Sequence, residues 1–115
     1  MTDLIDIRRD GRVLIIAFNR PDKKNAITHA MYAAVADALE AARTDAAVRV
    51  VLFTGNGDAF TAGNDLQDFA AGRAPGEEQP VQRFLKAITR FEKPLLKPTV
   101  GAGGRGVHVI EEDSM

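Results

Sequence analysis

The stretch Phe60-Thr61-Ala62-Gly63-Asn64-Asp65-Leu66 lies between two segments of different character. The apolar, β-branched run 48–53 before it predicts a buried strand, and residues 66–71 after it predict a short helix. A tight Ala-Gly turn from a strand into a helix exposes backbone N–H groups where partial positive charge collects. Such groups can hold an anion or a developing oxyanion. Most glycine turns of this kind bind no ligand, so the turn alone leaves both interpretations open.

Composition limits the classes of protein to consider. The chain has 115 residues, of which 45% are hydrophobic and 27% charged, so we expect a single small domain with a packed core. The formal net charge is −1, which predicts neither a nucleic-acid partner nor a basic membrane-binding patch. The absence of cysteine excludes disulfides, thiolate metal sites and a cysteine nucleophile. With no apolar signal or membrane-spanning run, we expect a cytoplasmic location.

The order of apolar patterns predicts an α/β fold. Residues 3–8 and 12–18 flank Asp10-Gly11 and read as a β-hairpin, whose second strand is apolar on both faces and is expected to be central and covered on both sides. Thr28 is a candidate N-cap for a helix that runs to about Arg43. Because strand 48–53 follows this helix, a right-handed crossover and a parallel strand pair are expected.

The helix 28–43 has an apolar stripe, and a second amphipathic helix is expected at 81–91. The stripe of the first helix consists of Met31, Val35, Leu39 and Ala42. The apolar face of the second consists of Phe84, Leu85, Ile88 and Phe91, and we expect it to form core or the wall of a ligand pocket. His29 lies off the first stripe and is interpreted as a surface residue of the first turn, not as a catalytic base.

The loop 19–26 carries three cations close together. Arg20, Lys23 and Lys24 flank Pro21, which ends the preceding strand. A cluster of this kind is usually a solvated turn, and its alternative role is to meet phosphate groups as point charges. The residues alone favour the solvated turn.

Several separated motifs occur in a fixed order along the chain. They are Asn19-Arg20-Pro21, Asn25-Ala26, Val50-Val51-Leu52-Phe53-Thr54-Gly55-Asn56-Gly57, the opening stretch 60–66, and Lys93-Pro94. In order and spacing they resemble the N-terminal half of the enoyl-CoA hydratase/isomerase (crotonase) family, over about residues 4–95. The form Gly63-Asn64-Asp65-Leu66 is most similar to peroxisomal-type Δ3,Δ2-enoyl-CoA isomerases and their bacterial relatives. The resemblance implies the N-terminal part of a ββα spiral with a mainly parallel sheet.

The resemblance also implies roles for individual residues. It assigns one oxyanion donor to the backbone N–H of Asn64, and a second to Gly106 by ungapped comparison. Contacts to coenzyme A (CoA) fall on Lys24, Ala26, Ala62, Gly63, Asp65 and Leu66. Lys24 would lie near phosphate, and Gly63 would let the backbone approach the thioester. Asp65 has a second interpretation as the N-cap of the following helix.

The resemblance implies a substrate and an assembly as well. The substrate is an acyl-CoA thioester, processed through an enolate held in the oxyanion hole, by hydration or by double-bond isomerisation. CoA is then part of the substrate, and no separate cofactor or metal is expected. Members of the family assemble as homotrimers or dimers of trimers, a state that is doubtful for a chain of this length.

From residue 96 onward the resemblance fails, which divides the chain into 1–95 and a Gly-rich, acidic tail at 96–115. Lys97 and Pro98 are expected to interrupt a central strand. Val109 stands where hydratases carry a catalytic glutamate, and no residue matches the isomerase base. The Gly101–Gly106 pattern resembles a dinucleotide fingerprint but lacks the flanking elements that this fold requires.

This divergence leaves the activity open. We expect a truncated or frame-shifted reading of a longer protein, with a genuine short homologue as the alternative, and little or no turnover by the chain as written. A catalytically dead CoA-binding fragment and a non-enzymatic interaction module are the alternative functions.

Overall fold

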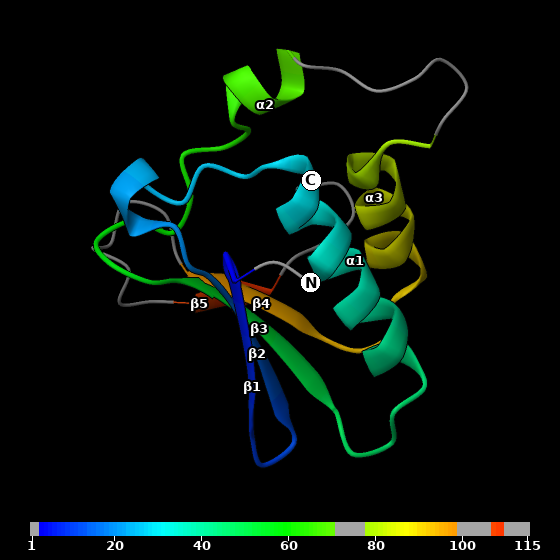
Figure 1. Ribbon diagram of the computed structural model, residues 1–115. Coiled ribbons are helices and arrows are strands. Elements are labelled where there is room, and N and C mark those ends of the chain that lie inside the picture. Colours follow the sequence, from blue (N-terminus) through cyan, green and yellow to red (C-terminus); the bar gives the residue numbers. More distant parts are fainter. Residues whose placement is uncertain (1–2, 71–77, 99–106, 110–115) are drawn as a thin grey trace.

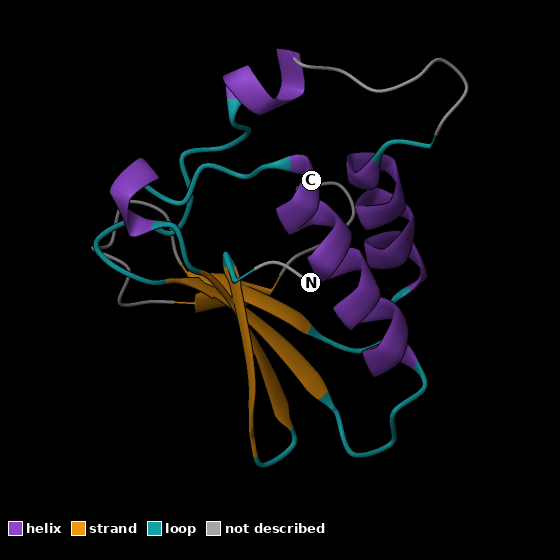
Figure 2. Ribbon diagram, in the orientation of Figure 1, coloured by secondary structure: helices purple, strands orange, loops and turns teal. Residues whose placement is uncertain are grey.

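The computed structural model describes residues 3–70, 78–98 and 107–109. One five-stranded sheet has the strand order β1-β2-β3-β4-β5, and the helices pack beside it (Figures 1 and 2). The strands are β1 (Ile5–Asp10), β2 (Val13–Phe18), β3 (Val50–Gly55), β4 (Leu95–Pro98) and β5 (Val107–Val109). The helices are η1 (Pro21–Lys23), α1 (His29–Arg43), α2 (Leu66–Ala70) and α3 (Pro80–Arg90). The predicted α/β class is confirmed.

The three inner strands are parallel and the two edge strands are antiparallel to them. The hairpin β1–β2 pairs Ile5 with Phe18 and Asp10 with Val13, as the Asp10-Gly11 turn predicts. Strands β2 and β3 are parallel, with α1 as the crossover, and β3 pairs in parallel with β4. Strand β5 closes the sheet as an antiparallel partner of β4.

The core lies between the sheet and the pair α1–α3. The predicted α1 stripe of Met31, Val35, Leu39 and Ala42 is buried and faces Ile16, Val51 and Phe53 of the sheet. Helix α1 begins where predicted, because the Thr28 hydroxyl accepts a hydrogen bond from the Met31 N–H.

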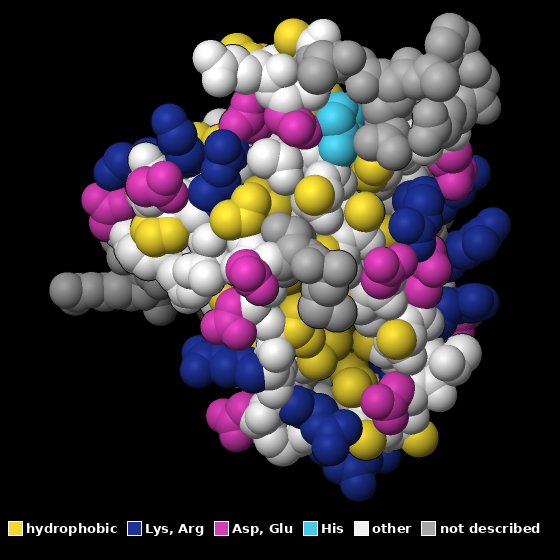
Figure 3. All heavy atoms as spheres, in the orientation of Figure 1, with side chains coloured by type: hydrophobic (Ala, Val, Ile, Leu, Met, Phe, Trp, Pro, Cys, Tyr) yellow, Lys and Arg dark blue, Asp and Glu magenta, His cyan; other side chains and the backbone are white. Residues whose placement is uncertain are grey.

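The described helices cover one face of the sheet (Figure 2). On the other face, Val13 and Ile15 of β2 are only half-buried. The prediction that β2 is covered on both sides is therefore not confirmed within the described residues. Apolar side chains also gather in a groove of about 300 Å³ between α1 and the β1–β2 hairpin (Figure 3).

Lys93 closes the C-terminal end of α1. Its Nζ donates to the carbonyl oxygens of Ala42, Asp45 and Val48, at 2.7 Å each. Carbonyl groups at the end of a helix lack intrahelical partners, and a lysine can satisfy them. Part of the Lys93-Pro94 motif therefore has a structural explanation, which sequence reasoning did not provide.

Strand β4 corrects one prediction. Lys97 and Pro98 belong to the strand and pair with His108 and Val107 of β5, although the pairing with β3 ends at Leu96. Pro98 is the last residue of the strand and has no partner in β3, so its missing N–H removes no hydrogen bond on that side. Strand β4 also runs across residue 96, where the resemblance was expected to fail. Gly101 and Gly106 lie outside the described residues.

Candidate functional site

The candidate site forms where the loops after β2 and β3 meet. Both strands are parallel, so their carboxyl ends lie at the same edge of the sheet, the edge where open α/β sheets bind ligands. The loop after β2 reaches the loop after β3 through a parallel bridge between Ile27 and Asn64. The N–H of Asn56 also donates to the carbonyl of Phe18 at 2.9 Å. Segments far apart in the sequence are thereby held side by side (Figure 1).

Asn25 fixes the two loops to each other. Its side chain is fully buried, and its Nδ2 donates to the carbonyl oxygens of Asn56 and Ala59 at 2.9 and 2.7 Å. Its Oδ1 accepts from the N–H of Arg20 at 2.7 Å. Asn25 has a φ of 58°, in the left-handed region that asparagine tolerates better than most residues. Sequence reasoning quoted Asn25 only as part of a motif and missed this function.

The backbone of residues 61–65 is held on one side only. The Gly63 carbonyl accepts from the Ile27 N–H, and the Asp65 N–H donates to the Ile27 carbonyl, both at 2.8 Å. The Thr61 hydroxyl accepts from the Gly63 N–H at 3.0 Å and donates to the Asn25 carbonyl at 2.7 Å. Gly63 has a φ of 91°, which L-residues with a side chain rarely adopt.

This hydrogen bonding directs the N–H of Asn64. A trans peptide is planar, so the Asn64 N–H points opposite to the Gly63 carbonyl, which faces Ile27. The Asn64 N–H therefore points outward, away from the bridge. Among the described residues, no hydrogen bond from this N–H is found. The turn thus presents a backbone donor that is free to meet a ligand.

Asp65 combines two structural contacts. Its Oδ1 accepts from the Asp68 N–H at 2.9 Å, so its predicted role as the N-cap of α2 is confirmed. Its Oδ2 pairs with the Arg20 guanidinium at 2.6 Å. The Asp68 N–H and then Arg20 hold the pKa of the Asp65 carboxyl below its ordinary value.

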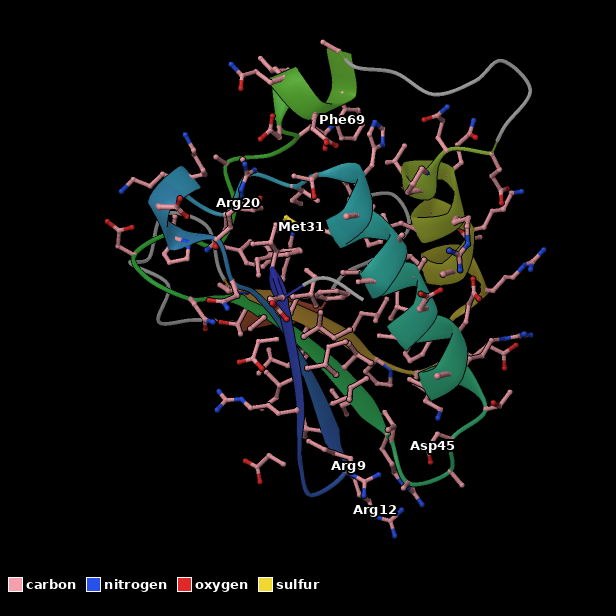
Figure 4. All side chains as sticks on the ribbon, in the orientation of Figure 1. Arg9, Arg12, Arg20, Met31, Asp45 and Phe69 are labelled. Atoms are coloured by element: carbon pink, nitrogen blue, oxygen red, sulfur yellow. The ribbon has the colours of Figure 1, made fainter. Side chains whose placement is uncertain are left out.

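Arg20 is an internal partner within the site. Besides pairing with Asp65, its guanidinium donates to the Ala26 carbonyl at 3.2 Å. Figure 4 shows Arg20 between the segment at η1 and the segment that leads to α2. Of the three cations considered for phosphate contact, Arg20 is therefore already engaged with the protein.

The other residues assigned to CoA by resemblance lie on the same edge. Lys24 is exposed and pairs with Asp58 at 2.9 Å, and its φ of 52° ends η1. Ala62 is exposed, and Leu66 is 81% exposed. The assignments of these residues to CoA stay predictions.

An apolar cavity of about 170 Å³ lies beside this turn. It is lined by Phe18, Ile27, Tyr32, Phe53, Phe60, Thr61, Phe84, Ile88 and Lys97. Phe84 and Ile88 come from the apolar face of α3, which was expected to form core or a pocket wall. Leu85 was expected on the same face, but it is 46% exposed. In the described part of the chain, the lining includes no carboxylate.

Tyr32 connects the cavity to the turn. Its hydroxyl donates to Asn64 Oδ1 at 2.6 Å. Its ring lies against Phe84 with a centroid distance of 5.0 Å, and against the edge of Phe69 at 6.1 Å. Burial raises the pKa of the Tyr32 hydroxyl, so it remains a donor at neutral pH. Sequence reasoning assigned no contact to the Asn64 side chain, and the spacing of residues 32 and 64 carries no signal for this one.

His29 is buried, which corrects the expectation of a surface residue. Helix α2 folds over the first turn of α1, and the Phe69 ring stacks on the imidazole at 4.2 Å. The His29 N–H donates to Asp68 Oδ2 at 2.7 Å. Figure 4 shows Phe69 directed from α2 towards the start of α1. The apolar spacing within α1 could not reveal this, because α2 supplies the cover.

Two features are absent from the described residues. None of their helices has the length and apolar character needed to cross a bilayer. No group of three or more potential metal ligands is found within 3–70, 78–98 and 107–109.

Comparison with known proteins identifies relatives along most of the chain. The family model described as enoyl-CoA hydratase/isomerase matches residues 8–110. Enoyl-CoA delta isomerase 2 of Rattus norvegicus is 38% identical over 83% of this chain and 27% of its own length. The 2,3-dehydroadipyl-CoA hydratase of Escherichia coli is 35% identical over 88% of this chain and 40% of its own. The chain thus spans well under half of either relative.

Solved structures of the same family superimpose on this chain. An enoyl-CoA hydratase/isomerase from Pseudoalteromonas atlantica superimposes with a TM-score of 0.77 at 44% identity. It covers 83% of this chain, and the match spans 38% of that structure. OdaA of Pseudomonas aeruginosa gives a TM-score of 0.78 at 43% identity, over 85% of this chain and 40% of its own.

Proposed function

This chain belongs to the enoyl-CoA hydratase/isomerase family, and we propose that it binds an acyl-CoA thioester and stabilises its enolate. The outward N–H of Asn64 beside an apolar cavity is the observation that carries the proposal. The thioester carbonyl would accept from this N–H, and the acyl chain would enter the cavity.

The enolate is the species that the turn would stabilise. When the α C–H bond of a thioester breaks and the proton leaves, the electron pair delocalises onto the thioester oxygen. A fixed N–H that faces this oxygen favours the enolate over the neutral thioester, which is the differential binding that catalysis needs. The Asn64 peptide is fixed before the ligand arrives, because Ile27 holds both sides of the bridge.

The CoA moiety would lie along the loops next to the turn. Lys24 is exposed enough to exchange Asp58 for a phosphate group, and Leu66 offers an uncovered apolar side chain to the adenine. CoA is part of the substrate in this proposal, and no separate cofactor takes part.

We expect the 115-residue chain to bind the thioester and to turn it over slowly or not at all. Hydration and double-bond isomerisation both require a group that moves a proton, and general acid–base catalysis contributes about 10²–10⁴-fold. The cavity wall of the described residues offers Tyr32, Thr61 and Lys97 but no carboxylate. A CoA-binding protein without turnover is therefore the second candidate function. The oligomeric state of the chain and its cytoplasmic location stay predictions.

Acetoacetyl-CoA tests the proposal, because its enolate absorbs in the ultraviolet and can form without a catalytic base. The full chain should bind it and should lower the pH at which the bound ligand ionises. An Asn64→Pro variant removes the N–H and should reduce the enolate fraction at a fixed pH by about 10²-fold, the effect of one lost oxyanion donor. Its affinity for CoA itself should change little.

Asn64→Ala is the matched control, because it keeps the backbone N–H and removes only the side chain. It should retain more enolate than the proline variant. Circular dichroism verifies that both variants fold. If the chain binds no CoA ligand, or if Asn64→Pro leaves the enolate fraction unchanged in a folded protein, the proposal is wrong.

A further inference from the structure

The Asn64 side chain is the part of the turn that the proposed function leaves unexplained. Its neighbours are constrained by the backbone bonds of Gly63 and Asp65 to Ile27. The Asn64 side chain itself accepts a hydrogen bond from the side chain of Tyr32, a residue of α1. Asn64 is exposed at the surface, yet the bond to Tyr32 is short, at 2.6 Å.

An asparagine at this point of a turn has an alternative partner. Asparagine side chains readily accept from a backbone N–H two residues further on, which bends the chain into an Asx-turn. Here that N–H belongs to Leu66, the first residue of α2. A side chain that turned to this N–H would compete with the Ile27 hydrogen bonds that fix the Gly63–Asn64 peptide, and would loosen the direction of its N–H.

The Asn64 side chain is instead bonded to Tyr32, whose ring has a fixed position. Phe84 of α3 and Phe69 of α2 hold its ring on two sides. The hydroxyl therefore meets Asn64 Oδ1 from a fixed place, on the side of the turn that carries the cavity. One hydroxyl thus links α1, the apolar cavity and the peptide that carries the free N–H.

We propose that Tyr32 is a positioning residue of the oxyanion site, which holds the Asn64 side chain so that its backbone N–H stays directed at the thioester oxygen. The proposal rests on the proposed function. It assigns Tyr32 no proton transfer, since the hydroxyl is already engaged with Asn64. The prediction is that Tyr32 governs enolate stability and has little effect on the affinity for CoA.

Tyr32→Phe is the informative substitution. It keeps the ring against Phe69 and Phe84 and removes only the hydroxyl. With acetoacetyl-CoA as the probe, the variant should reduce the bound enolate fraction at a fixed pH by about tenfold, less than the loss of the donor itself. Its dissociation constant for CoA, measured by calorimetry, should stay within about twofold of wild type.

Asn64→Ala removes the other partner of the same hydrogen bond. It should lower the enolate fraction by about the same factor as Tyr32→Phe. The double variant should lose no more than either single variant, because residues that act through one contact are not additive. A Tyr32 role limited to packing would leave the enolate fraction of Tyr32→Phe at the wild-type level.

The outcomes separate this inference from the function on which it rests. If wild type stabilises the enolate and Tyr32→Phe does so equally well, the positioning role is wrong and the proposed function stands. If the two single variants act additively, the positioning role is also wrong. If wild type binds acetoacetyl-CoA without a shift in its ionisation, or does not bind it, both proposals fall.

Discussion

The helix–sheet core and the site edge of this protein are held together by different forces. In the core, α1 packs on the sheet through fully buried apolar residues such as Ile16, Val35 and Leu39. At the site edge, the loops 19–28 and 55–65 are joined by hydrogen bonds from the buried Asn25 and by the pair Arg20–Asp65. Apolar burial is non-directional, whereas hydrogen bonds fix atoms relative to one another.

The difference explains how the site keeps an open donor. A loop packed by apolar contacts alone would leave the direction of its N–H groups free. Here the Asn25, Thr61 and Ile27 bonds consume the inward-facing polar groups of the turn. The N–H of Asn64 remains directed outward as a result. The core stabilises the fold, and the hydrogen bonds of the polar edge set the direction of the Asn64 N–H.

The largest stability effect should come from the core. Leu39→Ala removes a fully buried side chain between α1 and the sheet, and should lower the free energy of unfolding by about 3 kcal/mol, within the usual range for such cavities. Urea unfolding measures this loss. Under conditions where the variant is folded, its affinity for CoA should match wild type. Leu85→Ala is the control, because Leu85 is 46% exposed and its loss should change stability by less than about 0.5 kcal/mol.

A substitution at the polar edge should lower both the stability of the protein and its affinity for CoA. Asn25→Ala leaves the Arg20 N–H and the carbonyl oxygens of Asn56 and Ala59 without their partner. Since unsatisfied groups cost about 1–3 kcal/mol when buried, and this edge lies near solvent, we expect a loss of about 2 kcal/mol. Calorimetry should show that CoA affinity falls far more than in Leu39→Ala.

Asn56→Ala provides the matched control for Asn25→Ala. The Asn56 side chain makes an exposed hydrogen bond to Asn19 at 3.1 Å, so its removal should be nearly neutral. An Asn25→Ala protein that binds CoA like wild type would contradict the division between core and edge.

The same division explains what the sequence predicted. The hairpin, the crossover helix α1 with its Thr28 cap, and the apolar stripe from Met31 to Ala42 follow from periodicity and turn residues, and all were found. The N-cap role of Asp65 was also expected from its position just before the predicted short helix. These features depend on neighbours in the sequence, which a local pattern can report.

The site contacts connect residues 30 to 45 positions apart, where local patterns carry no information. Asn25 reaches Ala59, Tyr32 reaches Asn64, and Arg20 reaches Asp65 only after the parallel crossover is formed. The burial of His29 has the same origin, because its cover comes from α2. The family resemblance pointed to the correct turn, but the contacts that direct its N–H required the fold.

The smallest expected effect concerns the charge at the polar edge. The Asp68 N–H and Arg20 lower the pKa of Asp65 in the folded state below its ordinary value of 3.8. The ionised carboxylate therefore adds stability that is present above pH 3.8 and is lost as the pH falls through the folded-state pKa. Asp65→Asn separates the two roles, because asparagine caps a helix as well as aspartate but cannot pair with Arg20 as an anion. Urea unfolding should show the variant less stable than wild type at pH 7, with a gap that narrows at pH 3. No difference in stability between the variant and wild type at either pH would mean that the Arg20–Asp65 charge contributes nothing, and that the cap alone positions α2 beside the turn.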